Sequence, residues 1–191
     1  MKKRIVFIGA ILSLIPLGQP LLIGTGAALI SSAVIHSLSA KAETNNANSF
    51  YKKGLEKYDQ DDFRGALSEF TKAIKINSEY GDAYYHRGRV KQELLDIKGA
   101  IEDYTKAIKI NPNDGRAYYN RAIIKEGRRD FQGAIEDYKK AIKINPNDGR
   151  AYYNRAIIKE GRRDFQGAIE DYKKAIKINP NDGRAYYNRA I

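Results

Sequence analysis

The sequence predicts an all-α protein, a solenoid of stacked antiparallel helix pairs that follows an N-terminal hydrophobic leader. The first observation behind this prediction is literal repetition: residues 149–182 repeat residues 115–148 letter for letter. The second is that residues 81–114 and 47–80 carry more diverged copies of the same 34-residue unit. The third is the helical spacing of the apolar residues, with no β-type alternation after residue 47. A fixed period of this length is typical of arrays in which each unit buries its apolar face against the next.

Composition narrows the possible chemistry. The chain has 191 residues, of which 42% are hydrophobic and 30% are charged. It has no cysteine, which excludes disulfides, thiol nucleophiles and cysteine-ligated metals. The formal net charge is +11, and the leader, which has four basic residues and no acidic one, accounts for +4 of it. The remaining +7 is basic without being extreme.

The leader covers residues 1–42 and opens with Lys2, Lys3 and Arg4, after which the sequence is mostly apolar up to residue 38. A charged start, an apolar run and the small-residue site Ala40-Lys41-Ala42 are typical of a secretory signal, with cleavage expected after Ala42. We therefore expect the repeats to be exported into a periplasm or lumen, with membrane contact only through residues 5–38. The alternative is a membrane anchor, because this run is longer than a signal core of about 7–15 residues. A buried helix of a cytosolic protein is a less favoured third possibility.

The polar stretch that follows the leader shows no periodicity. We expect residues 43–46 to be a linker and Asn48 or Ser49 to cap the first helix of the array. Each 34-residue unit is expected to hold two helices, here named A and B, joined by a tight turn.

Helix B of the third unit (residues 115–148) is expected to begin after the cap Asp130 and to end before Pro146, because proline cannot continue a helix. Its apolar residues recur at offsets of three and four, at Phe131, Ala134, Ile135, Tyr138, Ala141, Ile142 and Ile144. Helix A, from Ala117 to about Lys125, has a wide apolar arc and so needs neighbours on two sides. Asn147 or Asp148 is expected to cap the next helix A, and Gly127 to take the left-handed position that closes helix A.

The unit resembles the tetratricopeptide repeat, whose pattern is an aromatic residue early in helix A, a small residue four positions later, then aromatic, Ala, aromatic, Ala and Pro through helix B. The third unit places Tyr118, Ala122, Phe131, Ala134, Tyr138, Ala141 and Pro146 at these positions, and the fourth matches it identically. The second unit fits with Tyr84, Gly88, Ile97, Ala100, Tyr104, Ala107 and Pro112, and the first has Ser78 instead of proline. The resemblance implies a right-handed solenoid of four repeats, 47–80, 81–114, 115–148 and 149–182, and the start of a fifth at 183–191.

Members of this family bind peptides or partner proteins in a concave groove lined by the A helices, so the resemblance implies a scaffold without catalysis of its own. Carried over by position, the groove residues are Tyr51, Leu55, Tyr85, His86, Arg89, Arg116, Tyr119, Asn120, Ile123, Glu126, Arg150, Tyr153, Asn154, Ile157 and Glu160. A subclass grips a terminal carboxylate with Lys, Asn, Asn, Lys and Arg. Here those positions hold Tyr85, Arg89, Asn120, Arg150 and Asn154, which disfavours such clamping but leaves acidic peptides as ligands.

The sequence departs from the family pattern inside helix A, where Arg121 and Lys125 stand at positions that usually hold Leu and Tyr. We expect their stems to lie over aromatic side chains, with the charges in water. Adjacent carboxylates such as Glu102 and Asp103 recur in every unit, as expected of a solvated helix rather than of an active site. His86 takes the place of Asn120 and Asn154 and is expected to be a polar residue of the helix surface. No cofactor or metal ligand set is expected.

Two alternative functions remain. Nucleic acid could bind Arg128, Arg129, Lys139, Lys140 and Lys143, although Glu136 and Asp137 intersperse these cations and make a solvated face the simpler account. The chain could instead be a regulatory or assembly subunit of an enzyme that a partner supplies. Because the sequence reaches residue 191 without a polar capping helix, we also expect either a truncated product or self-association at this end.

Overall fold

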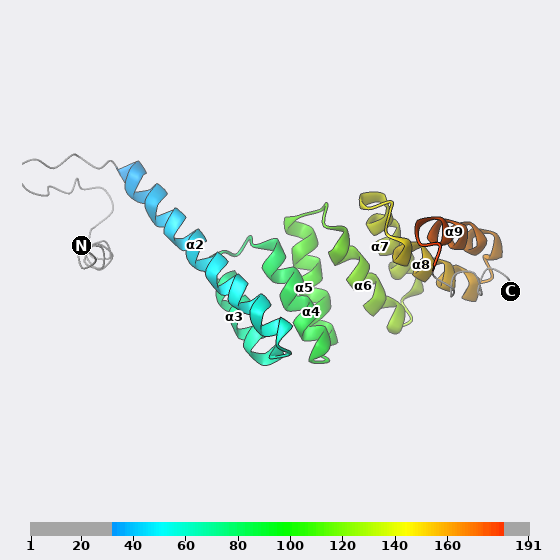
Figure 1. The fold of residues 1–191 in the computed structure, drawn as a ribbon, viewed down its shortest axis with the longest axis horizontal. Coiled ribbons are helices and arrows are strands. Elements are labelled where there is room, and N and C mark those ends of the chain that lie inside the picture. The colour runs from blue at the N-terminus through cyan, green and yellow to red at the C-terminus, as the bar shows by residue number, and fades with distance from the viewer. Residues whose placement is uncertain (1–31, 182–191) are drawn as a thin grey trace, which may run out of the picture. The chain divides into compact units, whose positions relative to one another are not determined.

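The structure is a computed structural model that describes residues 32–181. Every regular element in this range is an α-helix, as the sequence predicts (Figure 1). The helices are α2 (Ser32–Asp59), α3 (Phe63–Ile76), α4 (Gly81–Glu93), α5 (Ile97–Ile110), α6 (Gly115–Gly127), α7 (Phe131–Ile144), α8 (Gly149–Gly161) and α9 (Phe165–Ile178). From α3 onward, the odd-numbered helices are the B helices and the even-numbered ones the A helices.

The chain divides into two units between residues 45 and 46, and the described helices from α3 onward all belong to the second unit. The expected charged start and most of the apolar run lie outside the described residues, so the signal or anchor stays a prediction. No helix within residues 32–181 is long and apolar enough to cross a bilayer.

The first helix of the array begins earlier than we expected. Helix α2 runs without interruption through residues 43–46, and Asn48 lies inside it rather than capping it. The Asn48 side chain instead accepts a hydrogen bond from the Tyr80 hydroxyl at 2.7 Å. The polar residues of the expected linker include no glycine or proline, the residues that end helices most effectively, and so they continue the helix.

The B helices begin and end where the sequence indicates. Asp130 caps α7 by accepting a hydrogen bond from the Gly133 amide at 3.0 Å, and Asp62, Asp96 and Asp164 cap the other B helices in the same way. Helix α7 ends at Ile144, and Asn145, the residue before Pro146, adopts an extended conformation. Asp148 caps α8, as expected.

The turn between helices A and B differs from the prediction. Gly127 is the last residue of α6, and the left-handed conformation belongs to Arg129, with φ 63°. The Arg129 amide donates to the Glu126 carbonyl and the Asp130 amide to the Lys125 carbonyl, both at 2.8 Å. This pair of bonds closes the helix two residues later than the glycine suggested.

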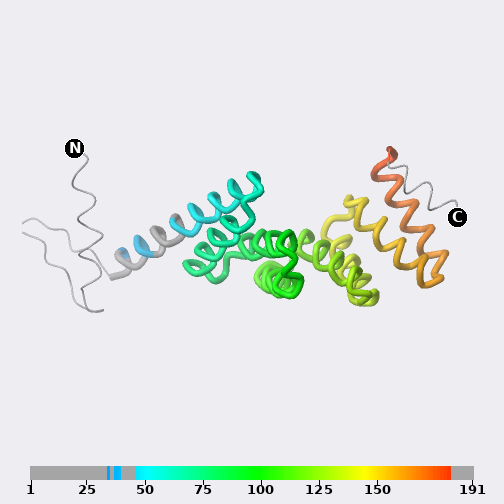
Figure 2. Tube along the Cα trace, turned by 90° about the horizontal axis from the view of Figure 1, so that it is seen from below, coloured from blue at the N-terminus to red at the C-terminus, as the bar shows by residue number. Residues whose placement is uncertain are grey.

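The hydrophobic core is shared between successive units. Each A helix packs on the B helix of its own unit and on the B helix of the unit before it. One buried cluster joins Tyr104 of α5 to Ala117 and Ile124 of α6, and the next joins Tyr138 of α7 to Ala151 of α8. Figure 2 shows the helix pairs following one another in chain order. Stacking therefore supplies burial that a single pair lacks.

A buried ion cluster recurs in the second, third and fourth units and corrects two expectations. The guanidinium of Arg121 itself lies over the Tyr118 ring, 5.8 Å from the ring centre, and it does not end in water. It donates to both carboxylate oxygens of Asp137, at 2.7 and 2.8 Å, and Lys125 lies 2.8 Å from the same carboxylate, whose side chain is 6% exposed. The equivalent clusters are Arg87 and Lys91 on Asp103, and Arg155 and Lys159 on Asp171. Asp103 is therefore a buried anchor, and of the adjacent pair only Glu102 is solvated.

Candidate functional site

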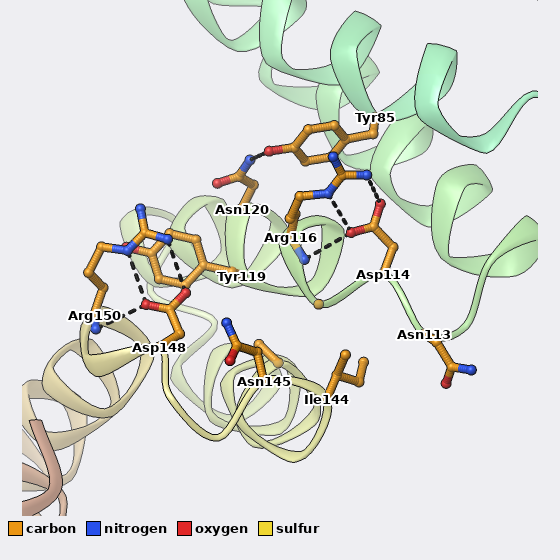
Figure 3. A pocket seen from close by; sticks show the side chains of 12 residues that line it. Tyr85, Asn113, Asp114, Arg116, Tyr119, Asn120, Ile144, Asn145, Asp148 and Arg150 are labelled. Carbon is orange, nitrogen blue, oxygen red and sulfur yellow. Dashed lines mark hydrogen bonds and ion pairs between the residues drawn. The ribbon is translucent and has the colours of Figure 1, made fainter. Parts of the chain in front are cut away.

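The A helices present a repeated arrangement of tyrosine and arginine, which Figure 3 shows from close by. The Arg116 guanidinium lies over the Tyr85 ring at 4.5 Å, and the Arg150 guanidinium lies over the Tyr119 ring at 5.0 Å. In each case the arginine comes from one unit and the tyrosine from the unit before it. The contact therefore joins consecutive A helices into one surface, in which the arginine guanidinium groups lie over the tyrosine rings.

Asparagines link the same helices a turn further along. Asn120 donates to the Tyr85 hydroxyl at 3.2 Å, and Asn154 donates to the Tyr119 hydroxyl at 3.3 Å. Burial raises the pKa of Tyr119, which keeps this hydroxyl neutral. Each asparagine uses one amide hydrogen in this bond, and its amide group also carries a second hydrogen and a carbonyl oxygen.

Arg116 and Arg150 differ in the number of acidic side chains that each one contacts. Arg116 pairs with Asp114 at 2.8 Å and with Asp82 of the preceding unit at 2.6 Å. Arg150 forms a fork with Asp148, both distances being 3.0 Å, and its side chain is 67% exposed. At the position of Asp82 the third unit has Arg116, so the acidic partner between units is not repeated.

A pocket of about 340 Å³ opens at the level of these side chains. Of the residues predicted for the groove, it includes Tyr85, Arg116, Tyr119, Asn120 and Arg150. Its other lining residues come from the C-terminal end of α7, from the first residue of α6 and from the two loops that precede α6 and α8: Asn113, Asp114, Gly115, Ala141, Ile144, Asn145 and Asp148. Sequence reasoning treated Asp148 only as a cap and missed this contribution, although the recurring Asn-Pro-Asn-Asp loop is visible in the repeat.

Apart from Tyr85, the predicted residues of the first two units lie outside this pocket and pack against neighbouring side chains. Tyr51 and Leu55 pack against the core around Phe70, and burial raises the pKa of Tyr51 to about 12. Arg89 lies over the Tyr58 ring at 4.5 Å and donates to its hydroxyl at 2.9 Å.

His86 is not the solvated surface residue that we expected. Its ring contacts those of Tyr51, Phe70 and Tyr85 at centroid distances of 5.6, 5.8 and 4.9 Å, and its Nδ1 atom is buried without a hydrogen-bond partner. Burial lowers the pKa of His86 to about 4, and the nearby arginines act in the same direction. Asparagine at this position binds the tyrosine of the preceding unit, whereas the larger histidine ring packs among aromatic side chains.

The remaining predicted residues lie outside the pocket of Figure 3. Ile123 packs against the core cluster that joins the third and fourth units, and Tyr153 packs beside the core of the fourth. Glu126 accepts a hydrogen bond from the Tyr138 hydroxyl at 2.8 Å, and Glu160 accepts one from the buried tyrosine of its own unit. A second, open hollow is lined by Ile157, Glu160, Gly161, Arg163 and Phe165.

No group of three or more His, Asp and Glu side chains within the described part of the chain is placed to hold a metal ion. The surface around Arg116 and Arg150 offers hydrogen-bond donors, charge and aromatic rings. Such groups bind and orient a ligand.

Sequence models of the tetratricopeptide repeat match residues 81–114, 115–148 and 149–182, and a further model of this repeat matches residues 51–94. No curated protein sequence matches the chain. Among solved structures, MamA shares 26% identity with a TM-score of 0.71, covering 78% of this chain and 80% of its own. YrrB, described as a repeat protein with an unusual peptide-binding site, shares 21% identity with a TM-score of 0.66, covering 83% and 90%.

The first repeat domain of Spaghetti, solved with an HSP90 peptide, shares 19% identity with a TM-score of 0.61 and covers 63% of this chain and 95% of its own. At these identities the YrrB and Spaghetti structures support the fold alone. The repeat models together span residues 51–182, which is more than half of the chain. The chain belongs to the tetratricopeptide repeat family.

Proposed function

We propose that this protein is an interaction scaffold that binds a segment of a partner polypeptide along its A helices, at the surface centred on Tyr85, Tyr119, Arg116 and Arg150. The exposed Arg150 guanidinium is the observation that carries the proposal. It is fixed by Asp148 and by stacking on Tyr119, so it is oriented before any ligand arrives. Orienting a side chain in advance reduces the entropy that binding costs.

The chemistry of this surface suits a polypeptide. Asparagine amides can donate to and accept from a peptide backbone, and tyrosine rings pack against side chains at low entropic cost. The exposed arginine favours a segment that carries a carboxylate, because arginine binds carboxylates through two parallel hydrogen bonds. The fold is compatible with such a ligand, because YrrB has an unusual peptide-binding site and the Spaghetti domain was solved with a bound HSP90 peptide.

Peptide selection on the immobilised full chain tests the proposal. A random displayed library is panned, and the affinities of recovered peptides are then measured for the parent protein and for Arg150→Ala. Because Arg150 is exposed and its partner Asp148 keeps its role as helix cap, this variant should fold normally. Removal of a charged hydrogen-bond donor should weaken binding at least about tenfold.

Arg64→Ala is the matched control, since Arg64 is an exposed arginine of α3, away from the proposed surface. It should bind the selected peptides as the parent does. Equal affinity of all three proteins would refute the location of the site. A selection that yields no binding peptide would refute the proposal as a whole.

A further inference from the structure

Six exposed lysines, three in each of the two identical units, take no part in the proposed function. They lie on the B helices α7 and α9, whereas the peptide-binding surface lies on the A helices. We name this set the lysine ridge: Lys139, Lys140, Lys143, Lys173, Lys174 and Lys177. Each lysine is exposed because neighbouring residues of the same helix, such as Tyr138 and Ala141 on α7, face the core.

The ridge is more basic than its sequence suggests. In sequence, two carboxylates precede the lysines of α7, but the structure removes one of them from the surface. Asp137 is 6% exposed and is held by Arg121 and Lys125 of the neighbouring A helix. Helix α7 therefore exposes one carboxylate, Glu136, and three lysines, and α9 repeats this arrangement.

The first two units do not share this surface. Each of them contains six basic and six acidic residues, whereas the third and fourth units each contain eight basic and five acidic residues. Thr71 and Thr105 stand at the position of Lys139. Lys106, at the position of Lys140, lies 3.5 Å from Glu79 of the preceding unit. The excess positive charge of the described array is thus concentrated on two identical units.

We propose that the lysine ridge binds the surface of a membrane that contains anionic phospholipids. Lysines act as point charges, and mobile headgroups can gather around them without a fixed pattern. The exposed aromatic side chains of these helices, Phe131 and Phe165, stand at the first residue of each helix, whereas the lysines lie toward its C-terminal end. Single-stranded nucleic acid is usually held by stacking of bases on aromatic rings as well as by charge. This contact is additional to the one expected through residues 5–38, and it leaves the A helices free to hold a partner.

Partition of the full chain onto lipid vesicles tests the proposal. One set of vesicles is phosphatidylcholine alone, and the other contains roughly one third phosphatidylglycerol. Binding to the neutral vesicles measures any contribution of the leader, so the increase on the anionic vesicles is the quantity of interest. It should fall at least tenfold when Lys139, Lys140, Lys173 and Lys174 are all changed to Gln, since each lysine near an anionic surface contributes roughly a fivefold factor.

The matched control removes the same charge elsewhere, with Lys52, Lys75, Lys98 and Lys109 changed to Gln. These lysines are exposed and belong to the two electrically balanced units. The control should keep most of the increase. Equal losses in both variants would assign the effect to net charge and overturn the proposal. A loss in the ridge variant of binding to a labelled oligonucleotide, without a loss on anionic vesicles, would overturn it in favour of nucleic acid.

Discussion

Replacing Asp137 by Asn should destabilise the protein severely, although the change is small and conserves shape. The substitution leaves Arg121 and Lys125, whose side chains are 15% and 23% exposed, facing each other without the carboxylate that both contact within 2.8 Å. Removing one partner of a buried ion pair costs about 3–5 kcal/mol. Total folding stability is typically about 5–15 kcal/mol, so a loss of this size is a large fraction of it.

The assay is urea unfolding of the full chain, followed by helical circular dichroism, with Glu136→Gln as the matched control. Glu136 is the adjacent carboxylate on the same helix, is exposed, and loses the same charge. The control should change the free energy of unfolding by less than about 0.5 kcal/mol. If Asp137→Asn proves no more destabilising than Glu136→Gln, the buried ion cluster does not stabilise the fold. Our explanation of why Arg121 and Lys125 replace the usual Leu and Tyr of helix A is then wrong.

Three further predictions concern the turn, the histidine and the last unit interface. Arg129→Gly should stabilise the protein by about 0.5–1 kcal/mol, because glycine adopts the left-handed conformation of this position without strain. Gly127→Ala should stabilise it by a similar amount, because residue 127 is helical and has open space where the new methyl group would lie. Thermal unfolding would show either effect. The pKa of His86 is about 4 in the folded protein and about 6.5 in the unfolded chain. The contribution of His86 to the free energy of unfolding should therefore be fully present above pH 6.5 and decline as the pH falls toward 4. The decline should be on the order of 1 kcal/mol after solvent screening. His86→Asn should flatten this decline in unfolding curves measured across that pH window, and an unchanged slope would contradict the assignment. Lys139→Thr should give Arg155 the hydroxyl acceptor that the equivalent arginines of the second and third units have, raising the unfolding midpoint slightly, by about 0.5 kcal/mol in free energy.

The helices were predictable because the physical signals that define them are local. Asp130, Pro146 and the apolar spacing between them act within one or two turns, and the repeat multiplies the signal. The left-handed residue was missed because glycine is only the preferred occupant of that conformation. The hydrogen bonds made by Arg129 and Asp130 decide which residue adopts it.

The charged residues were harder to place, because their partners lie far away in sequence. Arg121 and Asp137 meet only when the two helices of a unit pack together, and no local rule distinguishes Asp137 from the exposed Glu136 beside it. The co-occurrence of Arg, Lys and Asp in the second, third and fourth units was a usable signal for the ion cluster. The same limit applies to the pocket, since its lining residues come from three successive units.

The shared core also bears on how such a chain can change in length during evolution. The junction between the third and fourth units joins two identical stretches, so the surface that ends one stretch already fits the surface that starts the other. An additional copy inserted there by unequal recombination would pack on both sides against the same side chains as the existing copies do, and would need no compensating mutation. Genes for close relatives should therefore vary in whole multiples of this segment, with fractional insertions selected against.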